Sequence, residues 1–530
     1  MVINRMQNKG KRIVLASISF LIVAITNIMY MNFKWINIIN SDASSEFVLA
    51  KLLNDEGCFI SKQWFYSTEL RVLNTQFINK IGLFVFENNW KYARCLAMAL
   101  FMLLILLAAI YIGKQLYSVE FGLWAATIMI APIGKWYANN IIYFSYYMPH
   151  VLISVISIAL IMQISNSIGK KNIILNLALF ILSIAGGVGG IRQIMICYLP
   201  LMLLAIFVIA QKIILDNNID RKYFTISNGY LLSCVITLIG GCIGYVINHK
   251  LQYVYRFRSY EVMKWNKFKL SKLIDVAGDF LGLLGWNDST DVIGIGGIGN
   301  AIAIMYMLIL LGSILYFAKH YDRFSLGEKF IVLYFIAAFL VMLLCFSGID
   351  TYNESYWLPI IPFAYLIMMI SIKKLVVESE LILVIKRIIY IGLAVSVTIS
   401  CISTMYYPYL HTVVNYNKDR AGMTSWIVNH EYDKIVAPFW ESNLLTELTN
   451  GKIEAWTTFE DLEIDRWLQR VNHAEKLPEG RVAVILEKSE LTDNYNADKI
   501  DEYLVYEDDE YLVYDFDNID IYKQSLSDNQ

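Results

Sequence analysis

Two carboxylates spaced for proton transfer follow the first long apolar run of the chain. Asp42 and Glu46 stand four residues apart in the hexapeptide SDASSE. On a helix, this spacing places both side chains on one face. A carboxylate within hydrogen-bond reach of a hydroxyl can take its proton as a general base. The spacing also fits a structural role, in which Asp42 caps a short helix and Glu46 is merely solvated.

A second group of reactive side chains follows in the segment WFYSTELR. Trp64 and Tyr66 supply aromatic rings, Glu69 adds a carboxylate, and Arg71 adds a cation. Such mixtures are typical of sugar-binding sites, because rings stack on the C–H faces of a sugar while a few polar groups bind its hydroxyls. Trp and Tyr are also common anchors at membrane interfaces. The segment alone does not decide between these roles.

The composition indicates which elements position these residues. The 530-residue chain is 57% hydrophobic and 17% charged, whereas soluble domains are about 45–50% apolar and about 25% charged. The excess lies in runs close to the roughly 20 residues that cross a bilayer. This pattern excludes a disordered, fibrous or disulfide-rich secreted chain. We predict a polytopic α-helical membrane protein with about eleven transmembrane helices, near residues 13–31, 94–113, 119–134, 149–165, 173–190, 193–211, 225–247, 298–318, 328–346, 357–372 and 387–405.

Lysine and arginine gather in alternate connections between these helices. The basic connections include Arg12, Lys171, Arg221, Lys374 and Arg387. Because cytoplasmic loops carry an excess of Lys and Arg, the N-terminus is predicted to be cytoplasmic. Two long loops, 32–93 and 248–297, are then predicted to lie outside. With eleven spans, the C-terminal segment is predicted to be extracytoplasmic as well.

The charge balance changes near residue 405. Residues 406–530 carry 11 Lys and Arg against 26 Asp and Glu, whereas residues 1–405 carry 33 against 20. We therefore predict a transmembrane domain over 1–405 and a small extracytoplasmic α/β domain over 406–530.

Apolar patterns predict the elements of this tail. KIVAPF at 434–439 and RVAVILEK at 481–488 predict strands. FEDLEIDRWLQRV at 459–471 predicts a helix. YLVY occurs at 503–506 and again at 511–514, around EDDE, which predicts a hairpin.

The long outer loops contain amphipathic segments of their own. In 69–85, Leu73, Phe77, Ile81 and Val85 recur at four-residue steps, which predicts a helix lying in the membrane interface. A similar pattern occupies 269–286.

Two glycine-rich motifs need an interpretation. GIGGIG at 294–299 matches the form of a dinucleotide-binding fingerprint, but it precedes a membrane helix instead of joining a strand to an amphipathic helix. We interpret it, and GGVGG at 186–190, as sites of close helix packing.

The overall layout resembles the GT-C superfamily of membrane glycosyltransferases. The matching features are a basic N-terminus, one helix, and a long outer loop with an early acid, Asp42. Interfacial helices, many spans and an outer C-terminal domain follow. The segment DTYNESYWLPIIPF at 350–363 resembles the aromatic-Leu-Pro stretch before a late span in that family. The resemblance covers nearly the whole chain. It departs in the next outer loop, 134–150, where a second acid is frequent in GT-C enzymes and this chain has His150 and tyrosines instead.

The resemblance implies a reaction in which an acceptor hydroxyl attacks the anomeric carbon of a polyprenyl-phosphate sugar and polyprenyl phosphate leaves. It implies Asp42 as the general base, with Glu46 and Glu69 as the next candidates. Cations would hold the phosphate charge, and the candidates are Arg192, Arg256 and Arg258. The candidates for substrate binding are Arg71, Tyr66, His150, Glu354 and Tyr356.

The expected partners are a lipid-linked sugar donor in the cell membrane and a glycan or protein acceptor, without nucleic acid. No metal-ligand spacing is visible in the sequence, and a requirement for a divalent metal stays open. Two other functions remain as alternatives. A polysaccharide polymerase or ligase would use lipid-diphosphate donors. A transporter would be expected to show charges at mid-membrane depth and broken, repeat-related helices.

Overall fold

The computed structural model describes residues 2–67, 70, 75–215, 228–257, 264–349, 353–378, 383–406, 413–459, 461–491 and 500–527. The chain divides into two compact units. The membrane unit comprises residues 1–27, 99–249 and 263–407, and the loop–tail unit comprises residues 28–98, 250–262 and 408–530. Most of the first long loop therefore groups with the C-terminal residues. Each unit is described by itself below.

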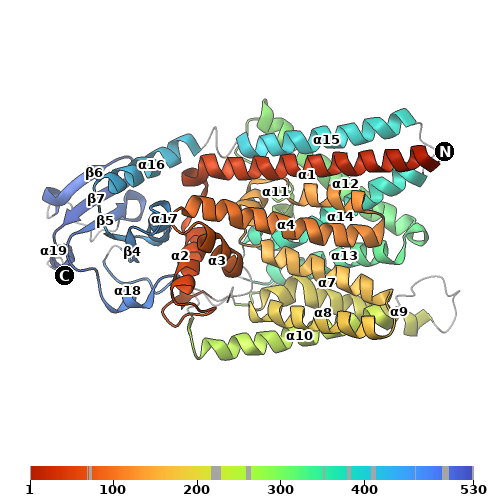
Figure 1. Ribbon diagram of the computed structural model, residues 1–530, viewed down its shortest axis with the longest axis horizontal. Coiled ribbons are helices and arrows are strands. Elements are labelled where there is room, and N and C mark those ends of the chain that lie inside the picture. The colour runs from red at the N-terminus through yellow and green to blue at the C-terminus, as the bar shows by residue number, and fades with distance from the viewer. Residues whose placement is uncertain are drawn as a thin grey trace. The chain divides into compact units, whose positions relative to one another are not determined.

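Every predicted span overlaps a helix (Figure 1). These helices are α1 (Val2–Ile38), α4 (Trp90–Leu116), α5 (Val119–Met129), α7 (Met148–Ser165), α8 (Lys170–Val188), α9 (Leu199–Leu215), α10 (Asn228–Gln252), α12 (Ile295–Lys319), α13 (Leu326–Ser347), α14 (Ile361–Glu378) and α15 (Leu383–Tyr406). Within the described residues, eight helices are long and apolar enough to cross a bilayer, and the stretches Val119–Met129, Ile194–Ala210 and Ile391–Met405 are shorter apolar helices. The chain is a multi-pass α-helical membrane protein.

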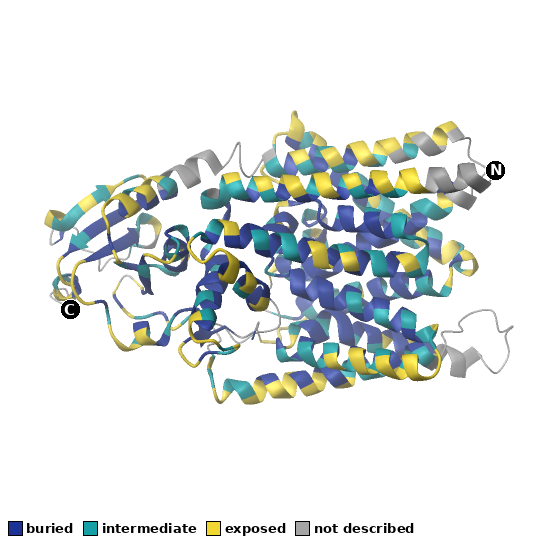
Figure 2. Cartoon of the chain, viewed as in Figure 1, coloured by how far each residue is buried: buried dark blue, intermediate teal, exposed yellow. Residues whose placement is uncertain are grey.

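The membrane unit has an inner and an outer set of helices. Most of α7 and α14 is buried inside the unit, whereas only a minority of the residues of α8 and α12 is buried (Figure 2). The exposed side chains of the outer helices are themselves apolar, such as Ile173 on α8 and Leu308 on α12. An apolar outer surface of this length suits the hydrocarbon core of a bilayer.

Two lysines near the end of α14 join three basic regions at one end of the membrane unit. The Nζ atom of Lys374 lies 3.1 Å from Oε2 of Glu328 and donates a hydrogen bond of 2.7 Å to the carbonyl of Arg323. The Nζ atom of Lys373 lies 4.6 Å from the centre of the Tyr117 ring. The connections that follow α4, precede α13 and follow α14 thus share one end, as alternate connections of antiparallel spans must.

Glycines bring membrane helices into close contact. A Cβ atom on Gly187 of α8 would lie 2.1 Å from the carbonyl oxygen of Gly241, and one on Gly244 of α10 would lie 2.1 Å from the carbonyl oxygen of Ile184. Gly299 of α12 approaches a side chain of α15 in the same way. Both glycine-rich motifs therefore serve helix packing, as the sequence indicates.

The tail of the loop–tail unit is a five-stranded sheet flanked by helices. The strands are β3 (Lys434–Ala437), β4 (Glu454–Thr457), β5 (Val482–Glu487), β6 (Leu504–Glu507) and β7 (Tyr511–Phe516), in the order β4-β3-β5-β7-β6. The strands β3, β4 and β5 are parallel, and β7 runs antiparallel to both β5 and β6. The flanking helices are α16 (Val413–Asn429), α17 (Phe439–Leu448), α18 (Val471–Glu475) and α19 (Ile519–Ser527). The predicted α/β tail, its strands and its hairpin are confirmed.

Both faces of this sheet are buried. Ile435 and Ile485 belong to one apolar cluster, whereas their neighbours Val436 and Val484 belong to another. Successive side chains of a strand point to opposite faces, so a strand that is covered on both sides needs a continuous apolar run. This requirement explains the run VAVIL within β5.

The helix predicted over 459–471 is wrong. Among its described residues, 461–470 are not helical, and helix begins only at α18. The backbone N–H of Asp465 donates to the carbonyl of Thr457 at 3.1 Å, and Thr458 pairs with Ile464 in an isolated bridge. Leu462 has a φ of +64°, which a helix does not allow. Backbone groups that would have made hydrogen bonds within a helix instead make them with residues at the end of β4.

Two helices and one strand of the first long loop complete the loop–tail unit. The helix α2 (Ser41–Asp55) packs against α3 (Thr75–Val85) and against α17 of the tail. The strand β1 (Phe65–Tyr66) pairs in parallel with β2 (Arg256–Phe257). On α3, Phe77, Ile81 and Phe84 are exposed while polar residues face inward. An exposed apolar face suits a helix that lies in the membrane interface. In the membrane unit, the amphipathic pattern at 269–286 forms α11 (Leu270–Gly282).

We expect Gly244→Ala to destabilise the protein by about 1–3 kcal/mol, the usual cost of forcing extra volume into a packed region. The added methyl group would collide with the backbone of α8, which cannot move aside alone. Gly312→Ala is the matched control, because a Cβ atom there meets nothing within 4 Å. The measurement is the unfolding free energy of the purified protein in detergent. Equal losses in the two variants would contradict the glycine contact between α8 and α10.

Candidate active site

Asp42 lies in the first turn of α2 without capping the helix. The N-cap is Asn40, whose Oδ1 atom accepts a hydrogen bond of 3.0 Å from the backbone N–H of Ala43. The side chain of Asp42 is half-buried and lines a cavity of the loop–tail unit. The N-terminal end of a helix stabilises a negative charge. A negatively charged side chain at this position therefore adds to the stability of α2.

Glu46 has a different environment on the same helix. It is 7% exposed, and its Oε2 atom accepts a 2.6 Å hydrogen bond from Thr75 Oγ1 and another from Gln76 Nε2. Both donors belong to the first turn of α3. Glu46 thus ties α2 to α3, and it is not among the described residues that line the cavity beside Asp42.

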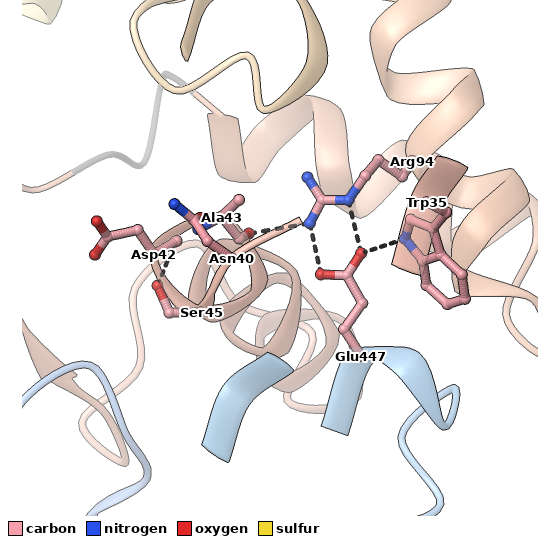
Figure 3. Close-up of polar contacts among 7 residues, drawn as sticks. All are labelled: Trp35, Asn40, Asp42, Ala43, Ser45, Arg94 and Glu447. Carbon is pink, nitrogen blue, oxygen red and sulfur yellow. Dashed lines mark hydrogen bonds and ion pairs between the residues drawn. The ribbon is translucent and has the colours of Figure 1, made fainter. Parts of the chain in front are cut away.

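A buried ion pair fixes α2 within the loop–tail unit (Figure 3). Nε and Nη2 of Arg94 donate hydrogen bonds of 2.6 Å each to the two carboxylate oxygens of Glu447. The same Nη2 atom donates to the carbonyl of Ala43 at 3.1 Å, and Trp35 Nε1 donates to Glu447 at 3.2 Å. Figure 3 shows the carboxylate of Asp42 pointing away from this pair. The pair therefore holds the backbone next to Asp42.

The cavity beside Asp42 lies at the carboxyl ends of the three parallel strands of the tail. Its volume is about 650 Å³. Segments that directly follow β3 and β4, together with the end of β5, supply most of its wall. Its carboxylates come from Asp42, Asp461, Asp465 and Glu487, and its aromatic rings include those of Phe439, Trp440, Phe459 and Trp467. In open parallel sheets, this edge is where ligands bind.

A second cavity of the loop–tail unit has a different charge. Its volume is about 630 Å³, and its described lining includes Arg256, Arg466 and Glu463. Leu462 lines both cavities. Arg256 also lies 3.9 Å from Glu475 in a half-exposed ion pair. The structure thus places the sequence candidate Arg256 beside Arg466, which the sequence did not single out.

Tyr66 has a structural environment in the loop–tail unit. Its hydroxyl accepts a 2.9 Å hydrogen bond from the backbone N–H of Ser61 and donates one of 3.1 Å to the carbonyl of the same residue. Its ring stacks on Phe257 at 5.2 Å. Burial raises the pKa of the Tyr66 hydroxyl, so the hydroxyl stays protonated and holds the turn before β1. The candidates Glu69, Arg71 and Arg258 lie outside the described residues.

The membrane unit brings Arg192 and Tyr356 together. The guanidinium carbon of Arg192 lies 4.7 Å from the ring centres of both Tyr147 and Tyr356, so the cation contacts two aromatic faces. Tyr356 belongs to a short 3₁₀ helix, η4 (Glu354–Ile360), which begins with the half-buried candidate Glu354. Tyr147 precedes α7 in the aromatic loop 134–150, but it was not among the sequence candidates for substrate binding.

His150 is joined to the residue that follows Arg192. Its Nδ1 atom donates a 2.9 Å hydrogen bond to Oε1 of Gln193, whose Nε2 atom donates to Ser154 Oγ at 3.0 Å. His150 and Gln193 are both buried. The chain of hydrogen bonds fixes the start of η2 (Ile194–Tyr198), a π-helical turn. His150 thus positions the segment that carries Arg192.

No protein-family model and no curated protein matches the chain. Among solved structures, it is similar to apo ArnT from Cupriavidus metallidurans, with a TM-score of 0.57 and 11% identity over 94% of this chain and 97% of ArnT. The structure of that ArnT bound to undecaprenyl phosphate gives a TM-score of 0.55 and 12% identity over the same shares. The chain has the GT-C fold.

An oligosaccharyltransferase from Archaeoglobus fulgidus is also similar, with a TM-score of 0.45 and 12% identity over 89% of this chain and 67% of the enzyme.

In the GT-C fold of the present chain, the loop after the first span carries Asp42 and the tail supplies the cavity that Asp42 lines. Among the described residues, no three His, Cys, Asp or Glu side chains are grouped so that they could hold a metal ion.

Arg94→Met should destabilise the protein by about 3–5 kcal/mol, because it leaves the carboxylate of Glu447 buried without its cation. The double variant Arg94→Met/Glu447→Leu should regain much of this loss, since it removes both charges. Denaturant unfolding in detergent measures both effects. Arg470→Met is the control: Arg470 lies 3.7 Å from Glu454 in a partly exposed pair, whose loss should cost about 0–1 kcal/mol. Equal losses for Arg94→Met and Arg470→Met would contradict the role given to the buried pair.

Proposed function

We propose that the protein is a glycosyltransferase that moves a sugar from a polyprenyl-phosphate donor to an acceptor outside the cell membrane. The observation that carries this proposal is the placement of Asp42, which follows the first span and lines a cavity rich in aromatic rings and carboxylates. The GT-C fold supports it, because ArnT shares that fold and one ArnT structure is bound to undecaprenyl phosphate.

The proposed reaction is a single displacement at the anomeric carbon. The acceptor hydroxyl oxygen forms the new bond to this carbon, and the bond from the carbon to the phosphate oxygen breaks with its electron pair. Asp42 takes the hydroxyl proton, which makes the oxygen a better nucleophile. Attack from the face opposite the leaving group inverts the anomeric configuration. Polyprenyl phosphate leaves as an anion.

The charge of the leaving phosphate needs cations close to it. Arg192 is one proposed partner: its guanidinium carbon lies 4.7 Å from the ring centres of both Tyr147 and Tyr356, and contact with aromatic faces helps to hold the cation in place. Arg256 is the other, because it shares a cavity with Arg466. Guanidinium groups suit phosphate, since they donate two parallel hydrogen bonds.

We also propose that the end of the membrane unit that holds Lys373 and Lys374 faces the cytoplasm. Its cations follow the distribution of cytoplasmic loops. With that orientation, the N-terminus is cytoplasmic and the tail is extracytoplasmic.

Asp42→Asn should lower the rate of sugar transfer by about 10²–10⁴-fold, the usual loss when a general base is removed. The amide keeps the shape of the side chain, so donor binding and thermal stability should stay close to those of the wild type. The measurement is turnover in nanodiscs with a panel of polyprenyl-phosphate sugars. Asp55→Asn is the control on the same helix, because Asp55 is exposed and only pairs with Lys51.

Two results would contradict the proposal. Turnover of a well-folded Asp42→Asn protein within about threefold of the wild type would remove Asp42 from the chemistry. Turnover of the wild type with lipid-diphosphate donors alone would instead favour a polysaccharide polymerase or ligase.

A further inference from the structure

The cavity beside Asp42 is built mostly by the tail, which the proposed chemistry does not otherwise use. β3, β4 and β5 are parallel, and residues at or just beyond their carboxyl ends form the wall. Val436, Val484 and Leu486 form an apolar floor. A concave site of about 300–1,000 Å³ with an apolar floor and a few polar groups is typical of small-ligand binding.

Two of the aromatic side chains that line this cavity are exposed to solvent. Trp440 is 46% exposed and Phe459 is 43% exposed. The rings of Phe439 and Trp440 pack edge to face with their centres 5.2 Å apart, so the Trp440 ring has a supporting neighbour. Exposed rings at a concave site offer apolar faces on which the C–H faces of a sugar ring can stack, while its hydroxyls reach nearby polar groups.

The charge of the cavity restricts what can enter. Four carboxylates line it, and no Lys, Arg or His occurs among its described lining residues. Like charges repel, and the repulsion is stronger at a partly desolvated site than in water. A phosphate or a uronate is therefore disfavoured there. The arginines Arg256 and Arg466 line the other cavity, so the loop–tail unit separates negative from positive surroundings.

We propose that the cavity beside Asp42 is the acceptor subsite of the proposed transferase, and that it takes a saccharide without negative charge, preferably one that carries a free amine. The rings hold the sugar, the carboxylates attract the ammonium group and bind hydroxyls, and one hydroxyl reaches Asp42. This inference rests on the proposed function for the reaction, but the binding itself needs no donor.

The test is isothermal titration calorimetry of the full-length protein in detergent with three trisaccharides, those of glucosamine, N-acetylglucosamine and galacturonic acid. We expect glucosamine to bind most tightly, N-acetylglucosamine more weakly, and galacturonic acid at least about tenfold more weakly than glucosamine. Trp440→Ala and Phe459→Ala should each weaken binding of the N-acetylglucosamine trisaccharide by about tenfold or more, as loss of a central aromatic contact does.

Charge variants test the selectivity separately from the fold. Asp461 is exposed, so Asp461→Asn should leave the fold intact and reduce the preference for glucosamine over N-acetylglucosamine. Asp517→Asn is the control, since Asp517 is an exposed tail acid outside the described lining. Equal affinities for all three trisaccharides, no binding, or unchanged binding in Trp440→Ala and Phe459→Ala would overturn the subsite.

The outcome is separable from that of the proposed function. If the trisaccharides bind as expected while Asp42→Asn retains full transfer, the subsite stands and the general base is wrong. If transfer depends on Asp42 but trisaccharide binding is unchanged in the cavity variants, the proposed transferase is supported and the subsite is wrong.

Discussion

The buried ion pair between Arg94 and Glu447 is the constraint on which the rest of the loop–tail unit depends. Removing two charges from water costs several kcal/mol each, and only close, bidentate geometry offsets that cost. Here both side chains are at most 2% exposed and share two hydrogen bonds of 2.6 Å. The third donor contact of Arg94 reaches Ala43. The geometry required by a buried charge thus also fixes the backbone beside Asp42.

Given this anchor, the charges of the unit fall into two groups with different roles. The carboxylate of Glu447 is fully used by Arg94 and Trp35, and that of Glu46 accepts from Thr75 and Gln76. Both stabilise the packing of α2. Asp42, on the same helix, instead faces a cavity. The helix α2 therefore carries one acid that holds the packing together, Glu46, and another that lines the cavity, Asp42.

The sequence predicts the helices and strands that depend on local patterns of apolar residues. Apolar runs locate the spans, and strand patterns locate β3 and β5. Arg94 and Glu447 are 353 residues apart, so no pattern reveals their pairing, although a lone arginine at the start of an apolar helix is a warning that it has a partner. The helix predicted over 459–471 fails for the opposite reason: its local periodicity is overridden by hydrogen bonds to the end of β4. The same loop then supplies Phe459, Asp461 and Asp465 to the cavity.

The most direct test of the account is an experimental structure of the full-length protein with a polyprenyl phosphate and a glucosamine trisaccharide bound together. The account predicts a sugar hydroxyl within about 2.6–3.2 Å of a carboxylate oxygen of Asp42, with the lipid phosphate in contact with a guanidinium group. A trisaccharide bound away from Asp42, or a continuous path through the membrane helices that is open to both sides, would contradict it.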